Sequence, residues 1–240
     1  MYAALLLPAL CFGFQDADNA EAPQSLGATI AEAESVPLFD GQTLDGWRGQ
    51  DGLWSVEDGA IVGRTSAEAP LKVNTFLIRD EPAENFELRL NYKIEGGNSG
   101  VQYRAEVFDE DQFRVRGPQA DIDSSPKYSG IHYSEQARGI VALRGQMTKV
   151  VPGGKKGVNQ FVGTCGDPAT LQKKFVKDGW NEYRIVADGP TMSHYINGQL
   201  MSRVTDTRPD RETAGVIALQ LHQGPPMVVR FKDVTIKRAP

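Results

Sequence analysis

The sequence predicts an all-β fold arranged as a single β-sandwich domain, and two observations carry this prediction. Short segments in which apolar and polar residues alternate follow one another through most of the chain, separated by turns rich in Gly, Asn and Asp. No segment keeps a 3.6-residue period, and only residues 169–176 suggest one or two helical turns. Many short strands of this kind are typical of a β-sandwich or jelly roll.

The strands can be placed from the turns that flank them. Asp58-Gly59 and Asn197-Gly198 each separate two strand-like segments, which predicts two β-hairpins with tight turns. Residues 86–94 alternate most cleanly and indicate a strand with one buried face. In residues 228–236 the apolar positions change phase near Lys232-Asp233, so we expect a bulge there. Strands are expected at 54–57, 60–64, 86–94, 182–186, 192–196, 200–204, 216–221 and 228–236.

Composition restricts the class of partner. The chain has 240 residues, of which 40% are hydrophobic and 24% charged, values that are ordinary for a globular protein with a sizeable core. Its net charge of −5 argues against a nucleic-acid partner, because phosphate binding needs a basic face. The short Lys pairs at 155–156 and 173–174 lack interleaved aromatic residues and are interpreted as solvated loops.

The first residues resemble an export signal. Residues 3–10 are apolar but too few to span a bilayer, and small residues follow them at a cleavage site, so residues 1–14 are predicted to be a signal peptide. Residues 15–35, rich in Ala, Asp and Glu, are predicted to be a linker, and residues 36–238 the folded domain. The expected location is therefore periplasmic or extracellular, and cleavage would leave Cys165 without a disulfide partner in the chain.

Polar side chains recur at alternate positions between residues 98 and 145. Successive strand residues point to opposite faces, so Gln119, Asp121 and Asp123 should share one face, and Gln102 should share one with Arg104. Residues 144–179, which show no periodicity, are expected to form a rim or lid over this face. One polar face is expected to collect Arg104, Gln119, Asp121, Asp123, His132, Glu135, Arg138, Arg144, Gln220 and His222.

Other interpretations of these residues remain open. An antiparallel sheet normally has one solvated face, although such a face favours Lys, Glu and Thr over this mixture. Two carboxylates on one strand, about 7 Å apart at ~3.3 Å per residue, also match the pairs of conventional glycosidases. Asp121, Asp123 and His132 could instead hold a divalent metal ion, since carboxylate and imidazole are suitable ligands. His194, without polar neighbours on its strand, is interpreted as structural.

Several stretches together resemble the 3-keto-disaccharide hydrolase family. They are P-L-F-D-G-Q-T-L-D-G-W at 37–47, W-S-V-E-D-G-A-I-V-G at 54–63, F-E-L-R-L-N-Y-K-I at 86–94 with G-N-S-G-V-Q-Y-R at 97–104, W-N-E-Y-R-I at 180–185, and G-V-I-A-L-Q-L-H-Q-G at 215–224. The resemblance implies a concanavalin A-like jelly roll that cleaves glycosides whose sugar carries a 3-ketone. Where the family commonly has Y-E-V-Q-I-x-D, this chain has G-P-Q-A-D-I-D at 117–123.

Such a reaction needs a base at C2, a donor to the enolate and an acid at the leaving oxygen. We expect Asp121 or His132 to be the base, His222 the acid and Arg104 the donor to the enolate. The other polar residues of the face are expected to bind the sugar. A lectin-like carbohydrate-binding module and a conventional glycosidase are the alternatives; the first would expose more aromatic platforms, and the second would carry Glu where Gln119 stands.

Overall fold

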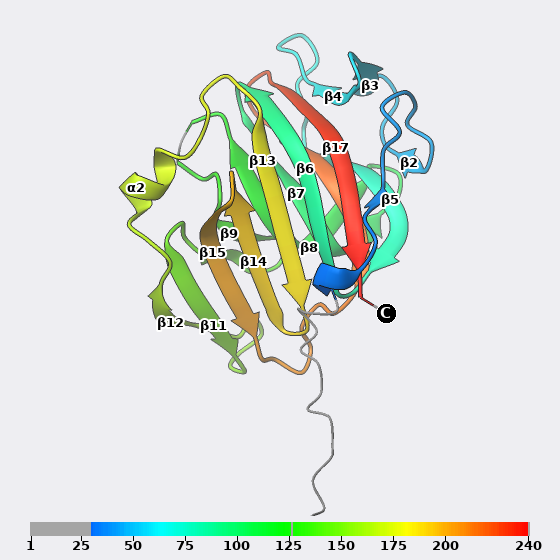
Figure 1. Ribbon diagram of the computed structural model, residues 1–240. Helices are drawn as coiled ribbons and strands as arrows, with labels where there is room; N and C mark the ends of the chain where they lie inside the picture. The colour runs from blue at the N-terminus through cyan, green and yellow to red at the C-terminus, as the bar shows by residue number, and fades with distance from the viewer. Residues whose placement is uncertain (1–29, 126, 240) are drawn as a thin grey trace, which may run out of the picture.

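A computed structural model describes residues 30–125 and 127–239, and these residues form a two-layer β-sandwich (Figure 1). The predicted signal peptide and most of the predicted linker lie outside the described residues. The sheet that faces the viewer in Figure 1, called the front sheet below, has ten strands. Nine of them form one continuous path, and β1 (Val36–Pro37) pairs with β17 (Val228–Arg238) beside it. That path runs β12 (Val158–Thr164), β11 (Gln146–Val151), β15 (Gln199–Asp206), β14 (Thr191–Ile196), β13 (Asn181–Asp188), β6 (Phe86–Glu95), β17 (Val228–Arg238), β4 (Ala60–Arg64) and β3 (Trp54–Glu57).

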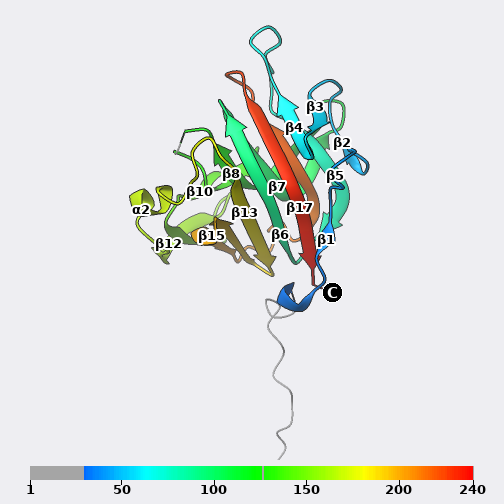
Figure 2. The ribbon, with the colours of Figure 1, turned by 45° about the horizontal axis from the view of Figure 1, so that its top comes forward.

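The back sheet has seven strands and packs behind the front sheet. Its order is β10 (Gly139–Ala142), β9 (His132–Glu135), β8 (Arg114–Asp123), β7 (Asn98–Asp109), β16 (Gly215–Leu221), β5 (Thr75–Ala83) and β2 (Trp47–Arg48). The short helix α2 (Pro168–Gln172) lies at the edge of the sandwich near β12 (Figure 2). The prediction of an all-β sandwich is confirmed.

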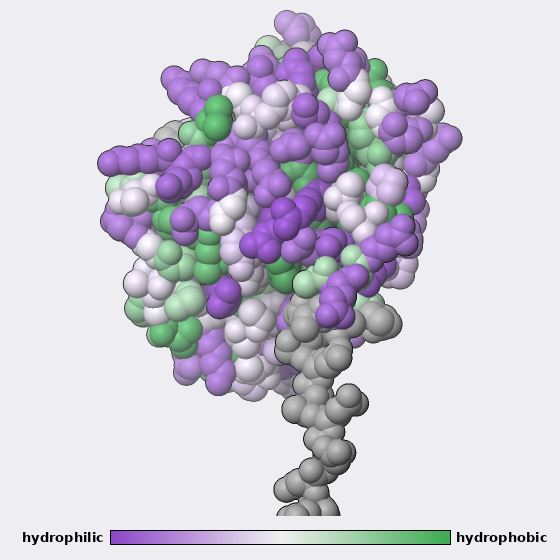
Figure 3. Space-filling model, in the orientation of Figure 1, coloured by the Kyte–Doolittle hydropathy of each residue, from purple (hydrophilic) through white to green (hydrophobic). Residues whose placement is uncertain are grey.

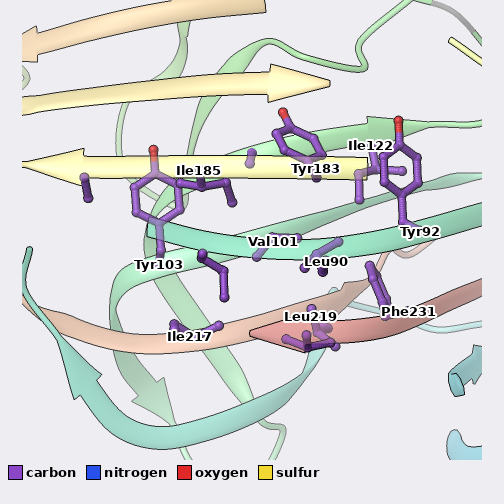
Figure 4. Close-up of a cluster of buried hydrophobic side chains, with 14 of the residues drawn as sticks. Leu90, Tyr92, Val101, Tyr103, Ile122, Tyr183, Ile185, Ile217, Leu219 and Phe231 are labelled. Carbon is purple, nitrogen blue, oxygen red and sulfur yellow. The ribbon is translucent and has the colours of Figure 1, made fainter. Parts of the chain in front are cut away.

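The core fills the space between the two sheets. Alternate residues of β6 and β13, such as Leu90 and Ile185, meet alternate residues of β7, β8 and β16, such as Val101, Ile122 and Leu219 (Figure 4). Each of these side chains is at most 1% exposed. Burial of one such side chain contributes roughly 1.5–3 kcal/mol, so the alternation of the sequence fixes which face of each strand looks inward.

The predicted turns appear where the sequence places them. Asp58 and Gly59 join β3 to β4, and Asn197 and Gly198 join β14 to β15, all with positive φ as a type I′ turn requires. The β17 pairing with β6 shifts register between Lys232 and Thr235, which confirms the predicted bulge.

Two stretches outside the strands expected above are more regular than the sequence indicates. Residues 104–128 are mostly the paired strands β7 and β8, and residues 144–179 contain the β11–β12 hairpin at the edge of the front sheet. Six of the seven residues of β12 are exposed, so no alternation marks this strand in the sequence. The prediction that residues 144–179 form a rim over the polar face is therefore wrong for the β11–β12 hairpin, because neither strand contributes a residue to the pocket described below.

Candidate functional site

A pocket of about 560 Å³ opens on the outer face of the back sheet, away from the sandwich core. Its floor comes from β8, β9 and β16, and its walls come from the loops that precede or follow the strands of the same sheet. Amide, carboxyl and phenol groups dominate the lining. The lining residues are Asn74, Gly97, Asn98, Gln119, Asp121, Asp123, Tyr128, Ile131, Tyr133, Glu135, Gln136, Ile140, Gln220, His222, Gln223 and Pro225.

Strand alternation places the polar residues of β8 in the pocket. Ala120 and Ile122 are fully buried in the core, so Gln119, Asp121 and Asp123 point the other way. Tyr133 and Glu135 reach the pocket from β9, Gln220 from β16, and His222 from just beyond it. The structure therefore brings together six of the predicted site residues: Gln119, Asp121, Asp123, Glu135, Gln220 and His222.

Asp121 is the most strongly perturbed group of the pocket. Its side chain is almost fully buried, and its Oδ1 is 2.8 Å from the amide nitrogen of Gln119 and 3.3 Å from that of Asn98. Burial raises the pKa of the Asp121 carboxyl to about 8, against the opposing effect of these amides, and the charges of Asp123 and Glu135 add to the rise. Asp121 therefore holds a proton near neutral pH.

Gly100 makes room for the Gln119 side chain. It lies opposite Asp121 in the β7–β8 pairing, and a Cβ added to it would come within 2.5 Å of Gln119 Cδ. Gln119 extends across this gap and reaches the amide of Gln102, 2.6 Å away. A glycine on β7 is thus what allows the buried amides to approach Asp121.

Glu135 is held by two amides at the opposite wall. Its Oε1 accepts hydrogen bonds from Asn74 Nδ2 at 3.1 Å and from Gln136 Nε2 at 3.3 Å. Asn74 also accepts a hydrogen bond from the backbone N–H of Gln223 at 2.9 Å, which ties this wall to the loop that carries His222. The carboxylate thus has a fixed orientation beside the pocket.

His132 does not face the pocket, contrary to prediction. Because Ile131 and Tyr133 line the pocket, the intervening His132 points into the sandwich, where its ring stacks on that of His194 at 4.9 Å between centroids. Tyr103 Oη contacts both rings, at 2.7 Å from His194 Nε2 and 3.4 Å from His132 Nδ1. Burial lowers the pKa of both imidazoles, so both rings are neutral. His132 is therefore a structural residue of the core, as was expected for His194.

Arg104 also lies away from the pocket. It sits in a β-bulge, with φ of 47°, where the register of β7 with β8 shifts between Gln102 and Glu106. The bulge breaks the alternation from which a common face with Gln102 was predicted. The guanidinium instead donates to the carbonyl oxygens of Glu84 at 2.7 Å and Gly189 at 2.8 Å.

The two other predicted arginines are likewise outside the pocket. Arg138 pairs with the buried carboxylate of Asp206 at 3.4 Å. Arg144 donates to the carbonyl oxygen of Ser129 at 2.9 Å and packs over the ring of Phe175. Both guanidiniums bind other parts of the protein, and neither lines the pocket, so the expectation that they line the sugar-binding face is wrong.

The metal site suggested by the sequence is not assembled. Asp121 and Asp123 face the pocket, whereas the His132 ring lies on the other side of the sheet. Within residues 30–125 and 127–239, no group of three His, Cys, Asp or Glu side chains is arranged to hold an ion. The geometry therefore does not support the alternative in which Asp121, Asp123 and His132 together hold a divalent ion.

Sequence reasoning missed most of the amide groups in the walls. Asn74, Gln136 and Gln223 come from turns between strands, where polar residues are expected whatever their role. Only Asn98 carried a signal, because it begins the stretch N-S-G-V-Q that becomes β7 and pairs with Asp123. Amides both donate and accept hydrogen bonds, and sugar hydroxyl groups need both.

The geometry agrees with a comparison of the whole chain with known families. A model of the 3-keto-alpha-glucoside-1,2-lyase-like domain matches residues 34–237. The chain belongs to this family. The resemblance drawn from the sequence motifs is confirmed. Among curated proteins, a 3-keto-disaccharide hydrolase of Bacteroides thetaiotaomicron is 38% identical over 79 residues, which are 30% of this chain and 27% of that protein.

Solved structures agree with the fold. A candidate glycosyl hydrolase from Parabacteroides distasonis superposes with a TM-score of 0.56 at 22% identity, covering 89% of this chain and 97% of that one. A carbohydrate-binding module from Bacillus subtilis superposes with a TM-score of 0.51 at 14% identity, covering 80% and 95% of the two chains. In the part of the chain that the structure describes, no helix is long and apolar enough to cross a membrane.

Proposed function

We propose that the pocket over the back sheet cleaves 3-keto-glycosides, with Asp121 as the acid and Glu135 as the base. The observation that carries the proposal is a buried carboxyl group, its pKa raised by burial, that faces a pocket lined with amides and two further carboxyl groups. A carboxyl group with a raised pKa that shares a site with a second carboxyl group is a recurring acid–base arrangement. Family membership supplies the class of substrate.

The 3-ketone makes the hydrogen on C2 acidic. Glu135 takes that proton, and the electron pair of the C–H bond forms the enolate of the C3 ketone. The enolate then expels the C1 oxygen, and the C1–O bond breaks as Asp121 gives its proton to the leaving oxygen. Water adds across the resulting C1=C2 double bond, so the net reaction is hydrolysis. A positioned acid or base contributes roughly 100- to 10,000-fold in rate.

This assignment replaces the roles that the sequence suggested for Arg104, His132 and His222, and it makes Asp121 the acid in place of the base. Arg104 and His132 are hydrogen bonded elsewhere and do not reach the pocket. His222 lies at its rim, half-buried, with Nδ1 in contact with the carbonyl oxygen of Gln223, and is assigned to binding. Asp123, Gln119 and Gln220 complete the sugar-binding set. We also infer export from the cell, on the basis of the apolar N-terminal residues.

The decisive experiment incubates the protein with a 3-keto-disaccharide and, separately, with its unoxidised parent. Cleavage of the keto sugar alone is the expected result. Cleavage of the parent would identify a conventional glycosidase, and tight binding of either sugar without turnover would identify a carbohydrate-binding module. Either result overturns the proposal.

A further inference from the structure

The carboxyl of Asp121 is the end of a row of side-chain amides that runs under the pocket. Gln102, on β7, is fully buried and contacts Gln119, on β8, at 2.6 Å; Gln119 in turn contacts Asp121 at 2.8 Å. Gln220, on β16, touches Gln119 from the other side at 3.4 Å. Three neighbouring strands thus contribute one amide each, and each amide can be turned so that either its oxygen or its nitrogen faces a given neighbour.

The backbone around Gln102 decides how the first amide is turned. One end of this amide faces the carbonyl oxygens of Gly117 and Pro118, which only accept hydrogen bonds. If the oxygen of Gln102 occupied that end, it would face two acceptors and no donor. With the nitrogen there, Gln102 donates to Gly117 at 3.2 Å and to Pro118 at 3.0 Å. Buried polar groups that lack partners are costly, so the second orientation is favoured.

That choice propagates along the row. The oxygen of Gln102 then faces Gln119, which must present its nitrogen at 2.6 Å. The Gln119 amide is therefore reversed relative to the contact described above, so that its oxygen and not its nitrogen lies 2.8 Å from Asp121 Oδ1. Two oxygens at this distance need a proton between them, and only a protonated Asp121 can supply it. Asn98 can still donate to the same carboxyl oxygen at 3.3 Å, because that oxygen keeps acceptor capacity.

Gln220 gives independent support. With its oxygen toward Gln119, the nitrogen of Gln220 is buried and has no hydrogen-bond partner among the described residues. When Gln119 turns its oxygen toward Asp121, that oxygen also lies near Gln220, whose amide can then rotate and donate to it at 3.4 Å. An unpaired buried N–H is rarer than an under-satisfied carbonyl oxygen. Gln102 and Gln220 therefore both favour the arrangement in which the Gln119 oxygen faces Asp121.

We propose that Gln102 and Gln119 form an amide relay, anchored on the carbonyl oxygens of Gly117 and Pro118, that holds Asp121 in its protonated form. Gln102 touches neither the pocket nor the substrate and is a positioning residue. The raised pKa of Asp121 agrees with this arrangement but is not needed for it. The inference rests on the proposed function only where it assigns the Asp121 proton to the leaving oxygen.

The test follows the Asp121 carboxyl directly, by carbon-13 NMR titration of the full chain without substrate. Replacing Gln102→Met removes the anchor, so Gln119 becomes free to turn its nitrogen toward Asp121 and stabilise the carboxylate. The midpoint of the Asp121 titration should then fall by about one pH unit or more. Asn98→Ala removes a donor to the carboxyl and should shift the midpoint upward. Ser99→Ala, a buried change on the same strand outside the relay, should leave it within a few tenths of a unit.

An unchanged or raised midpoint in Gln102→Met would overturn the proposal. Should that variant fail to fold, neutron diffraction from the wild-type protein decides the matter, because deuterium marks the nitrogen end of each amide. We expect the nitrogen end of the Gln102 amide beside the carbonyl oxygens of Gly117 and Pro118, and a deuterium between Asp121 and Gln119. Nitrogen of Gln102 beside Gln119 would refute the relay. Neither measurement uses a substrate, so a protein that cleaves no keto sugar could still possess the relay.

Discussion

The outer faces of the two sheets carry similar polar residues in very different surroundings. On the front sheet, Arg89 bridges Glu87 and Glu182, and hydrophilic side chains spread over the surface in Figure 3. Arg89 and Glu182 are 43% and 39% exposed in that bridge. On the back sheet, Asp121 is 5% exposed and has amides in place of cations as neighbours.

The difference lies in what replaces water around each carboxyl group. Burial alone would raise the pKa of Glu87, but hydrogen bonds from Arg89 and Arg184 outweigh it and the pKa falls below its usual value. Among the described residues, no cation lies within hydrogen-bonding distance of Asp121, so burial prevails and its pKa rises to about 8. Strand alternation is common to both faces; the depth of the pocket and the kind of neighbour decide whether the pKa of the carboxyl group rises or falls.

The largest effect that separates the faces is the pH dependence of stability. Because the folded protein holds a proton on Asp121 that the unfolded chain loses near its ordinary pKa, the contribution of Asp121 to the free energy of unfolding should fall as pH rises from about 4 to about 8. Asp121→Asn has no such proton, so its free energy of unfolding relative to that of the wild type should increase by up to about 5 kcal/mol over this range. Denaturant unfolding of both proteins across the pH series measures the difference.

Glu87→Gln on the front sheet is the matched control and should behave with the opposite sign. The lowered pKa of Glu87 stabilises the fold above its usual pKa, so the wild type should lose its advantage over this variant as pH falls. A difference between wild type and Asp121→Asn that stays flat with pH would show that Asp121 titrates normally and that the comparison of the faces is mistaken.

The second effect is on turnover. Glu135→Gln should cut the rate on a 3-keto-disaccharide at least about 100-fold, equivalent to about 2.7 kcal/mol, because the amide cannot take the C2 proton. Asp121→Asn should cause a similar loss on this substrate but a much smaller one on an aryl 3-keto-glucoside, whose leaving oxygen needs no acid. Glu182→Gln, on the front sheet, should keep the wild-type rate. Equal losses by Asp121→Asn on both substrates would assign it to binding.

The sequence predicts the sandwich well because alternation and turn residues are local signals. The same alternation places Gln119, Asp121 and Asp123 correctly, since they lie on one uninterrupted strand. It fails at Arg104, because the bulge that reverses its direction depends on how β7 pairs with β8.

His132 shows a second limit of local signals. Both Ile131 and His132 are almost fully buried, so polarity alone does not indicate which of them faces the core. The imidazole is accommodated inside because His194, from the opposite sheet, stacks on it and Tyr103 hydrogen bonds to it. Partners so distant in the sequence leave no mark near residue 132.

The third effect concerns packing beneath the pocket. Gly100→Ala would push a methyl group to within 2.5 Å of Gln119 and displace its side chain. Overpacking of this kind typically costs about 1–3 kcal/mol. In the relay, the Gln119 oxygen accepts the Asp121 proton, so displacing this amide should also lower the titration midpoint of Asp121. Gly163→Ala on the front sheet meets only the flexible end of Met147, so its cost should be smaller. Thermal unfolding compares the two, and an equal loss in both would remove the special role of Gly100.

The smallest effect belongs to the front-sheet ion pairs. Arg89→Gln removes hydrogen bonds to Glu87 at 2.7 Å and to Glu182 at 3.4 Å. Because the Arg89 side chain is 43% exposed, each of these pairs should contribute no more than about 1 kcal/mol to the free energy of unfolding. Because dissolved ions screen exposed charges, this contribution should shrink in about 1 M salt, where the Debye length is about 3 Å. The titration midpoint of Asp121, whose neighbours are neutral amides in a buried site, should move little in the same salt series. A large, salt-independent loss in Arg89→Gln would mean that the front face is as strongly desolvated as the pocket, and the contrast between the two faces would then need another cause.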